Sequence, residues 1–315
     1  MAITISIGSG KGGTGKTMII ANLALLLARS GRRVCLVDLD LGGADAHYLF
    51  GLLQPKRSLS DFLNRRVDRL DQVIHPLYAY HGLGLIPGSG DTLQTANISF
   101  QEKQRLFRAL RQIDTDILLL DVGAGTSFHA LDFFMHSDIQ IGLTQPEPTA
   151  ILDFYNFLQL ATIRRVLSAF LSGSEAALAL KKGRFSTLQE VLDLAGRSDR
   201  DGLAKAREAL SFFHPLLIIN RDGTGGMVNK VKLRQMVARY LAIELPELGD
   251  IPEDRSVAEA LKAFIPLCEL SPNCPAAQAL QGIADKLAKI VDLFVHHQQA
   301  ADRREISPGG NPRSP

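Results

Sequence analysis

Residues 8–17 read Gly8-Ser9-Gly10-Lys11-Gly12-Gly13-Thr14-Gly15-Lys16-Thr17. An apolar stretch typical of a strand, Ile3 to Ile7, precedes this run, and a helical run, Met18 to Arg29, follows it. Glycines let backbone N–H groups turn inward on a phosphate, and the N-terminus of the following helix favours negative charge. The spacing Gly10-x4-Gly15-Lys16-Thr17 therefore predicts a phosphate-binding loop between a strand and a helix.

The side chains of this loop carry further chemistry. Lys16 has the length to reach the β- and γ-phosphates of a nucleotide, and the Thr17 hydroxyl is a suitable ligand for Mg²⁺. The predicted nucleotide contacts run through the loop into the helix and comprise Gly10, Gly12, Gly13, Thr14, Gly15, Lys16, Thr17 and Met18.

The composition is that of an ordinary globular protein. The chain has 315 residues, of which 46% are hydrophobic and 22% charged, and this length fits one large domain or two small ones. A formal net charge of +2 gives no strong signal for polyanion binding. No signal peptide is visible, and no apolar stretch approaches about 18 residues, so we expect a cytoplasmic protein without a membrane-spanning helix.

The three cysteines suit that compartment. Cys35 lies in an apolar run and is expected to be a buried strand residue, whereas Cys268 and Cys274 are spaced C-x5-C. This spacing fits neither a zinc ribbon nor a thioredoxin-type pair. We therefore expect reduced thiols.

Apolar runs alternate with amphipathic helical patterns along the chain. Runs that are apolar throughout indicate strands buried on both faces, as in a parallel sheet. The alternation predicts an α/β fold with a doubly wound, mainly parallel sheet and flanking helices, in which ligands bind at the carboxyl ends of the strands. The expected strands are Val34–Val37, Leu83–Ile86, Ile117–Leu120, Ile139–Thr144 and Leu216–Ile219, and the expected helices include 100–113, 149–170 and 228–241.

One stretch breaks this rhythm. Residues 171–209 have helical patterning, a mild excess of basic residues and no convincing strand, and a solvated helical face is the simplest explanation of the charge. We therefore expect one domain over residues 1–298 with a helical insertion at about 171–209. Residues 299–315, rich in Pro, Gly, Ser and Arg, are expected to form a disordered tail.

A second lysine, Lys11, distinguishes the loop from an ordinary P-loop. Lys-Gly-Gly-x-Gly-Lys-Thr resembles the deviant Walker A motif of the MinD/ParA family of P-loop ATPases. In that family the first lysine crosses a dimer interface and contacts the phosphates bound to the other subunit. The resemblance implies this catalytic role for Lys11, beside Lys16; the alternative is a solvated lysine at the edge of a loop.

Two further segments carry the resemblance. Asp38-Leu39-Asp40 resembles the family's switch I, which implies that Asp38 helps to hold the Mg²⁺ shell and that Asp40 positions the attacking water. Asp121 ends a strand like that of a Walker B motif, which implies a metal contact through water, and Gly123 would sense the γ-phosphate. The alternatives are helix caps for the first pair and a buried strand ending in a glycine turn for the second.

The resemblance extends over about residues 1–295. An asparagine after the strand that ends at Ile219 reads the purine in the family, which implies this role for Asn220, with Arg221 beside it. The segment 249–254, which contains Pro252, resembles a late loop that packs over the base.

Several segments resemble the MinD and FlhG/FleN branch more than plasmid-partition ParA: 38–45, Leu49-Phe50-Gly51, Gly88-Ser89-Gly90 and Ala96-Asn97. That branch implies a switch that binds ATP and Mg²⁺, dimerises on ATP, hydrolyses it slowly and positions or counts a flagellum or division site together with a protein partner. Asp45 stands where the branch usually has asparagine, and His47 where it often has aspartate. An extra carboxylate repels phosphates unless it is protonated or turned away, so these departures bear on the hydrolysis rate.

The last expected helix, residues 276–297, has apolar residues at helical spacing. Core packing is one interpretation. The other is contact between its end and the inner face of the cytoplasmic membrane, since proteins of this branch end in an amphipathic helix.

Three other functions remain as alternatives. A ParA-like segregation ATPase bound to the nucleoid needs a basic surface, for which the insertion is the one candidate; nucleic acid is therefore the less expected partner. An ATP-sensing, non-catalytic regulator is suggested by Asp45. An iron–sulfur carrier needs cysteines near switch II or a C-x-x-C pair, and the sequence has neither.

Overall fold

The computed structural model describes residues 2–40, 43–88, 98–170, 178–180, 183, 185–223 and 229–306, with side chains up to His297. Parts of the branch-specific segments (Leu41-Gly42, Ser89-Gly90 and Ala96-Asn97), the first residues of the insertion and the end of the expected tail, 307–315, lie outside these residues.

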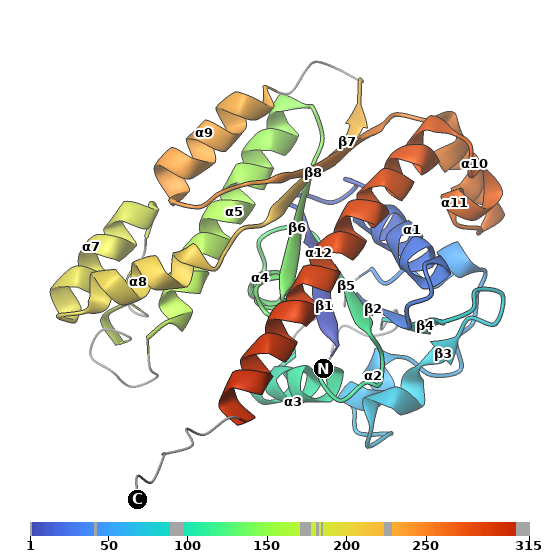
Figure 1. Cartoon of the computed structure of the whole chain (residues 1–315), viewed down its shortest axis with the longest axis horizontal. Coiled ribbons are helices and arrows are strands. Elements are labelled where there is room, and N and C mark those ends of the chain that lie inside the picture. Colours follow the sequence, from blue (N-terminus) through green and yellow to red (C-terminus); the bar gives the residue numbers. More distant parts are fainter. Residues whose placement is uncertain are drawn as a thin grey trace, which may run out of the picture.

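An eight-stranded sheet in the order β3-β4-β2-β5-β1-β6-β7-β8 forms the centre of the molecule (Figure 1). Neighbouring strands are parallel except at the β3–β4 edge. The predicted doubly wound sheet is confirmed, and β3 and β8 are strands that the sequence did not reveal. The strands are β1 (Ile3–Gly8), β2 (Val34–Leu39), β3 (His75–Pro76), β4 (Leu83–Ile86), β5 (Ile117–Val122), β6 (Ile139–Thr144), β7 (Leu216–Asp222) and β8 (Glu247–Pro252).

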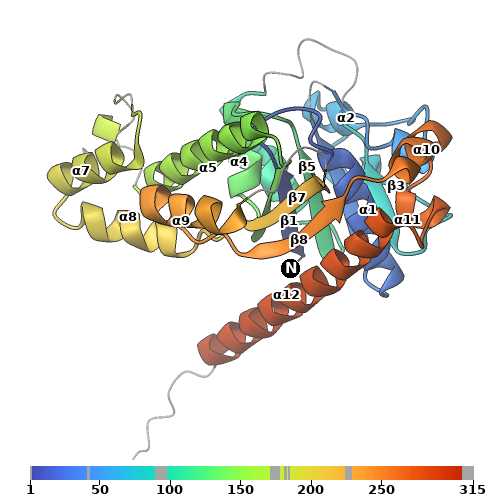
Figure 2. The ribbon, with the colours of Figure 1, turned by 90° about the horizontal axis from the view of Figure 1, so that it is seen from above.

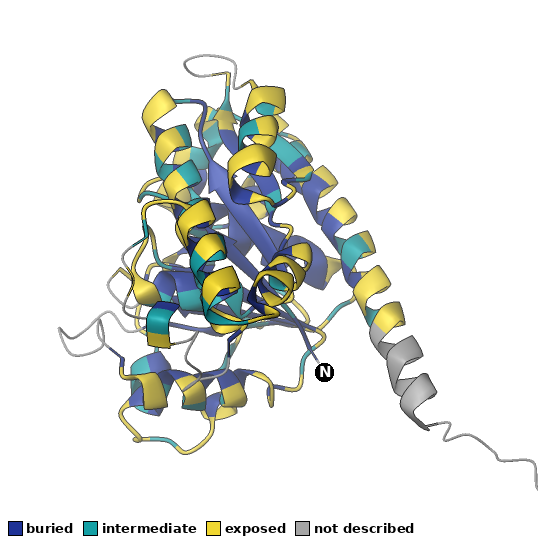
Figure 3. Ribbon diagram, turned by 90° about the vertical axis from the view of Figure 1, so that its left-hand side faces the viewer, coloured by how far each residue is buried: buried dark blue, intermediate teal, exposed yellow. Residues whose placement is uncertain are grey.

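Helices cover both faces of this sheet, and the strands between them are buried (Figure 3). One face packs against α1, α11 and α12, and the other against α2, α3, α4, α5 and α9. The helices are α1 (Lys16–Arg29), α2 (Leu59–Leu63), α3 (Phe100–Leu110), α4 (Phe128–Met135), α5 (Pro148–Ser168), α7 (Leu188–Ser198), α8 (Gly202–Ser211), α9 (Lys230–Leu241), α10 (Arg255–Ala263), α11 (Leu267–Leu270) and α12 (Pro275–Ile306), with short 3₁₀ turns at Tyr48–Phe50 and Leu70–Val73.

The described part of the insertion is helical, as expected. Helices α7 and α8 extend away from the sheet beside α5 (Figures 1 and 2). Their apolar faces, which include Leu188, Val191 and Leu210, join the core formed by α5. The insertion is therefore held by burial of apolar surface rather than by strand pairing.

Helix α12 crosses the sheet and then leaves the body of the molecule (Figure 2). Leu280, Ile283, Leu287 and Val291 are buried against α1 and the sheet, which confirms core packing for most of this helix. The helix continues to Ile306, beyond the expected domain end at residue 298. Extending an existing helix adds one hydrogen bond per residue and avoids the cost of a new nucleus. In the described part of the chain, no helix is long and apolar enough to cross a membrane.

Candidate functional site: a phosphate-binding loop at the carboxyl edge of the sheet

The glycine-rich loop follows β1, which lies between β5 and β6 in the sheet. Gly15 of this loop is the N-cap residue of α1. Gly15 has φ +95° at this cap, a left-handed conformation that favours glycine. Hydroxyl groups brace the loop from within: the Thr14 Oγ1 donates to Ser9 Oγ at 3.0 Å, and Ser9 Oγ donates to the Lys11 carbonyl at 2.8 Å. The backbone is thus fixed before any phosphate binds.

Neighbouring elements brace the loop from outside. The Asn220 amide, at the end of β7, donates to the Thr14 carbonyl at 2.8 Å, and the Gln145 amide, after β6, donates to the Gly13 carbonyl at 3.3 Å. A Cβ on Gly10 would lie 2.0 Å from the Asp153 carbonyl oxygen of α5. Only glycine allows this approach, so the sheet and α5 together set the shape of the loop.

Lys16 lies buried in the first turn of α1. Burial lowers the pKa of its ammonium group, whereas the carboxylates of Asp121, Asp40 and Asp45 raise it. The structure therefore brings the predicted site residues Asp40 and Asp121 close to Lys16, together with Asp45.

Asp121, at the end of β5, has the environment expected of a cation site. Both of its carboxylate oxygens are buried, and among the described residues only the Thr17 hydroxyl and the Lys16 ammonium offer them polar company. Burial raises the pKa of this carboxyl well above its usual range, although the Thr17 hydroxyl and Lys16 nearby lower it. A buried carboxylate with so few hydrogen bonds is costly unless a cation completes its environment, so Asp121 and Thr17 fit Mg²⁺.

Asp38 differs from Asp121. Its Oδ1 accepts the Asp40 N–H at 3.0 Å and its Oδ2 accepts the Ala46 N–H at 3.1 Å. These bonds hold the two ends of the switch I loop together. The expectation that Asp38 also supports the metal shell stays a prediction.

The other switch residues converge on the same place. The position that a Cβ on Gly123 would occupy is 3.4 Å from Asp40 Oδ1, so the segment that follows β5 lies beside the segment that follows β2. Desolvation is the largest cause of the raised pKa of Asp45; Asp40 raises it further, and the Thr17 hydroxyl, His47 and Lys16 lower it. Although Asp45 as a residue is exposed, its carboxylate faces the loop.

A cavity of about 410 Å³ opens over these groups. Lys16, Thr17, Asp40 and Asp45 line it with the loop glycines, and the rim carries three apolar side chains that sequence reasoning missed: Tyr48, Leu261 and Phe264. These belong to segments far apart in the chain, and no local pattern marks them. The cavity has the size of an ordinary ligand pocket.

Lys11 points to α5 in the isolated chain. Its Nζ lies 3.3 Å from Glu147 Oε2, the residue that precedes the first turn of α5. Both side chains are partly exposed, so the pair contributes little to stability. Sequence reasoning missed Glu147, whose only local signal is its place before Pro148 at a helix start.

Several predicted nucleotide contacts do not line this cavity: Gly10, Thr14, Gly123, Asn220, Arg221 and Pro252. Arg221 pairs with Glu253 through two hydrogen bonds, at 2.6 and 3.1 Å, and Pro252 ends β8. Neither lines the cavity. Their role at the base, like that of Asn220, stays a prediction.

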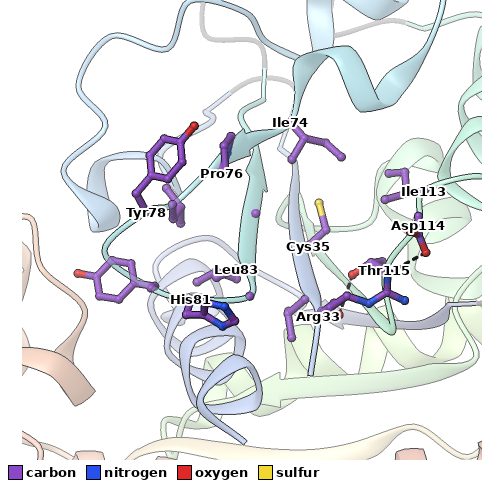
Figure 4. Close-up of a pocket in the computed structure, with 15 residues that line it drawn as sticks. Arg33, Cys35, Ile74, Pro76, Tyr78, His81, Leu83, Ile113, Asp114 and Thr115 are labelled. Carbon is purple, nitrogen blue, oxygen red and sulfur yellow. Dashed lines mark hydrogen bonds and ion pairs between the residues drawn. The ribbon is translucent and has the colours of Figure 1, made fainter. Parts of the chain in front are cut away.

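A second cavity, of about 340 Å³, lies at the opposite ends of the strands (Figure 4). It is lined by residues at the amino ends of β2 and β4, and its rim holds the ion pair between Arg33 and Asp114. None of the predicted site residues lines it, so the two cavities are chemically separate.

Comparisons with known proteins agree with this geometry. Residues 5–267 match the family model of the CobQ/CobB/MinD/ParA nucleotide binding domain. The antiactivator FleN of Pseudomonas aeruginosa is 28% identical over 90% of this chain and 85% of its own length. The flagellum site-determining protein YlxH of Helicobacter pylori is 34% identical over 48% of this chain and 51% of its own.

Among solved structures, the septum site-determining protein MinD of Pyrococcus horikoshii, complexed with Mg-ADP, has a TM-score of 0.65. It is 24% identical and the match covers 93% of this chain and 98% of the other. At this identity the match shows the fold.

Proposed function

Because this chain belongs to the CobQ/CobB/MinD/ParA nucleotide-binding family, we propose that it is a switch that binds ATP and Mg²⁺, dimerises on ATP and hydrolyses ATP slowly. The observation that carries the proposal is the buried Lys16 under a 410 Å³ cavity, facing the carboxylates of Asp121, Asp40 and Asp45. A phosphate chain placed there would meet loop N–H groups, a lysine and a cation site together.

The residues divide the chemistry between them. The loop N–H groups and Lys16 bind the β- and γ-phosphates, and Asp40 orients the water that attacks the γ-phosphorus. Mg²⁺ held at Thr17 and Asp121 neutralises charge on the same phosphates when it is bound. Gly123, in contact with Asp40, transmits the presence of the γ-phosphate to switch II.

Lys11 supplies the dimerisation step. We propose that ATP draws two chains together and that Lys11 leaves Glu147 to contact the phosphates of the partner. The partly exposed pair at 3.3 Å is weak enough to be exchanged for a charge-assisted contact with phosphate.

The biological output follows from the relatives. One similar protein is an antiactivator and another is a flagellum site-determining protein, so we propose that this switch positions or counts a cell structure, a flagellum or a division site, through a protein partner. The end of α12 carries the exposed apolar residues Leu293 and Phe294, which suit peripheral contact with a membrane. Co-sedimentation with anionic liposomes in ATP detects such contact, and its absence would leave a switch that acts away from membranes.

Asp45 favours a second candidate, a regulator that senses ATP without turning it over. Its carboxylate lies near Thr17 and Asp40 and adds negative charge where phosphates and water must meet. Measuring hydrolysis separates the two candidates.

Phosphate release from ATP in the presence of Mg²⁺ is the test. We expect slow release by the wild type and a fall of about 100-fold in Asp40→Asn, the scale of a lost proton-accepting or water-orienting group, with ATP affinity kept within a few-fold. The matched variant Asp45→Asn is expected to bind ATP more tightly, because it removes a charge that faces the phosphates. A wild type without Mg²⁺-dependent release would favour the sensing regulator, and an Asp40→Asn variant as fast as the wild type would remove Asp40 from the mechanism.

A further inference from the structure

A further cleft, of about 560 Å³, lies between α3, α4 and α5 and is distinct from the two cavities described above. We call it the α3–α4–α5 cleft and define it by Phe100, Lys103, Phe107, Asp132, His136 and Arg164. Figures 1 and 2 show α4 beside α5. None of these residues lines the cavity over the loop.

The cleft holds more positive than negative charge, and its charged side chains are partly shielded from water. Lys103 of α3 and Arg164 of α5 both form ion pairs with the one carboxylate of Asp132, on α4. The side chains of Lys103, Asp132 and Arg164 are 8%, 18% and 31% exposed. Two cations share one carboxylate, so a net positive charge remains where water screens it weakly.

Aromatic rings surround these charges. His136 stacks on Phe107 with the ring centroids 3.6 Å apart, and burial lowers the pKa of His136 to about 4, so it adds no charge at neutral pH. Phe100 at the mouth is 72% exposed, as is Phe128, over whose ring Arg164 lies. Aromatic residues and arginine are enriched at protein-binding surfaces, and here exposed rings lie beside Arg164 and the buried Lys103.

The position of Asp132 links the cleft to the nucleotide. Helix α4 begins at Phe128, directly after the segment 123–126 that resembles switch II, and Gly123 of that segment lies beside Asp40, whose atoms are the nearest to the position that a Cβ on Gly123 would occupy. A ligand that displaced Asp132 from Lys103 and Arg164 would therefore act on the helix that continues switch II.

We propose that the α3–α4–α5 cleft is the docking site for an acidic segment of a partner protein. Carboxylates of the segment pair with Lys103 and Arg164 in competition with Asp132, and its apolar side chains pack on Phe100 and Phe107. Charge complementarity selects the acidic occupant. Cations that lie this deep suit single side chains that reach inward, whereas a nucleic acid backbone needs cations displayed at the surface.

The probe is a fluorescein-labelled peptide, Glu-Glu-Phe-Glu-Glu-Leu-Glu, whose binding to the full chain is followed by fluorescence anisotropy at low salt. A peptide with every Glu replaced by Gln, and a single-stranded oligonucleotide, serve as comparison probes. We expect Arg164→Gln to weaken binding of the acidic peptide about tenfold and Phe100→Ser about fivefold, the scale of interface anchors. Asp132→Asn is expected to bind it several-fold more tightly, because the competing carboxylate is gone.

Matched variants control for general effects. Phe212→Ser removes a ring that is 70% exposed at the C-cap of α8, and Asp116→Asn removes a carboxylate that pairs with Arg33 instead; neither is expected to change the affinity. Phe100→Ser keeps the test valid if Arg164→Gln fails to fold, since Phe100 is mainly outside the core. Equal binding of the Gln peptide, weaker binding to Asp132→Asn, or an oligonucleotide that binds through Arg164 and Phe100 would overturn the proposal.

Discussion

Replacing Lys16 with alanine is expected to lower the affinity for ATP by at least about 100-fold. Its ammonium is buried among the carboxylates of Asp121, Asp40 and Asp45, so the variant loses the cation that offsets them as well as its bonds to phosphate. Each charge-assisted hydrogen bond contributes about 1.5–3 kcal/mol, and about 1.4 kcal/mol is a tenfold change in affinity. Two such bonds account for the expected loss.

Isothermal titration with ATP and Mg²⁺ measures this effect, and circular dichroism verifies that the variant is folded. Lys11→Ala is the matched control, because Lys11 lies on the same loop but pairs with Glu147 outside the cavity; it is expected to keep ATP affinity within a few-fold. A folded Lys16→Ala protein that bound ATP like the wild type would remove Lys16 from the phosphate site.

The second large effect is structural. Gly10→Ala is expected to destabilise the protein by about 3 kcal/mol or more, at the upper end of overpacking substitutions. The new Cβ would lie 2.0 Å from the backbone oxygen of Asp153, and no change of side-chain rotamer relieves a clash with backbone. Either the loop or α5 must move.

Urea unfolding without nucleotide measures the loss. Gly12→Ala is the control two residues away, since its new Cβ would meet nothing nearer than the Ala124 Cβ at 3.9 Å, and its stability is expected to change by about 0.5 kcal/mol or less. If the two variants were equally stable, α5 would not constrain the loop as described.

Much of the fold could be predicted because its strands are buried on both faces. Continuous apolar runs such as Ile117–Leu120 are unambiguous when glycine or aspartate ends them. Strand β8 (Glu247–Pro252) escaped because it has only two large apolar residues, Leu248 and Ile251, at a spacing that is not the two-residue period of a strand, and because it contains a glycine and a proline. The last residues of α12 were not predicted to be helical. The apolar helical pattern ends near residue 297, and the Pro/Gly-rich residues that suggest a tail begin only after Ile306.

The site could be predicted in part for a similar reason. The loop residues are contiguous, so their spacing alone indicates phosphate binding. Gln145, Asn220 and Asp153 contact the loop although they lie more than 130 residues from it in the sequence. Lys11 and Glu147 are separated in the sequence by a similar distance. Such contacts depend on strand order, which one sequence does not specify.

Sedimentation velocity of the purified chain in Mg²⁺ with either ADP or ATP tests the central claim most directly, with Lys11→Ala run beside the wild type. The account predicts a wild type that is monomeric in ADP and dimeric in ATP, and a Lys11→Ala variant that binds ATP yet stays monomeric in both nucleotides. A wild type that remained monomeric in ATP, or a Lys11→Ala variant that dimerised as fully as the wild type, would contradict it.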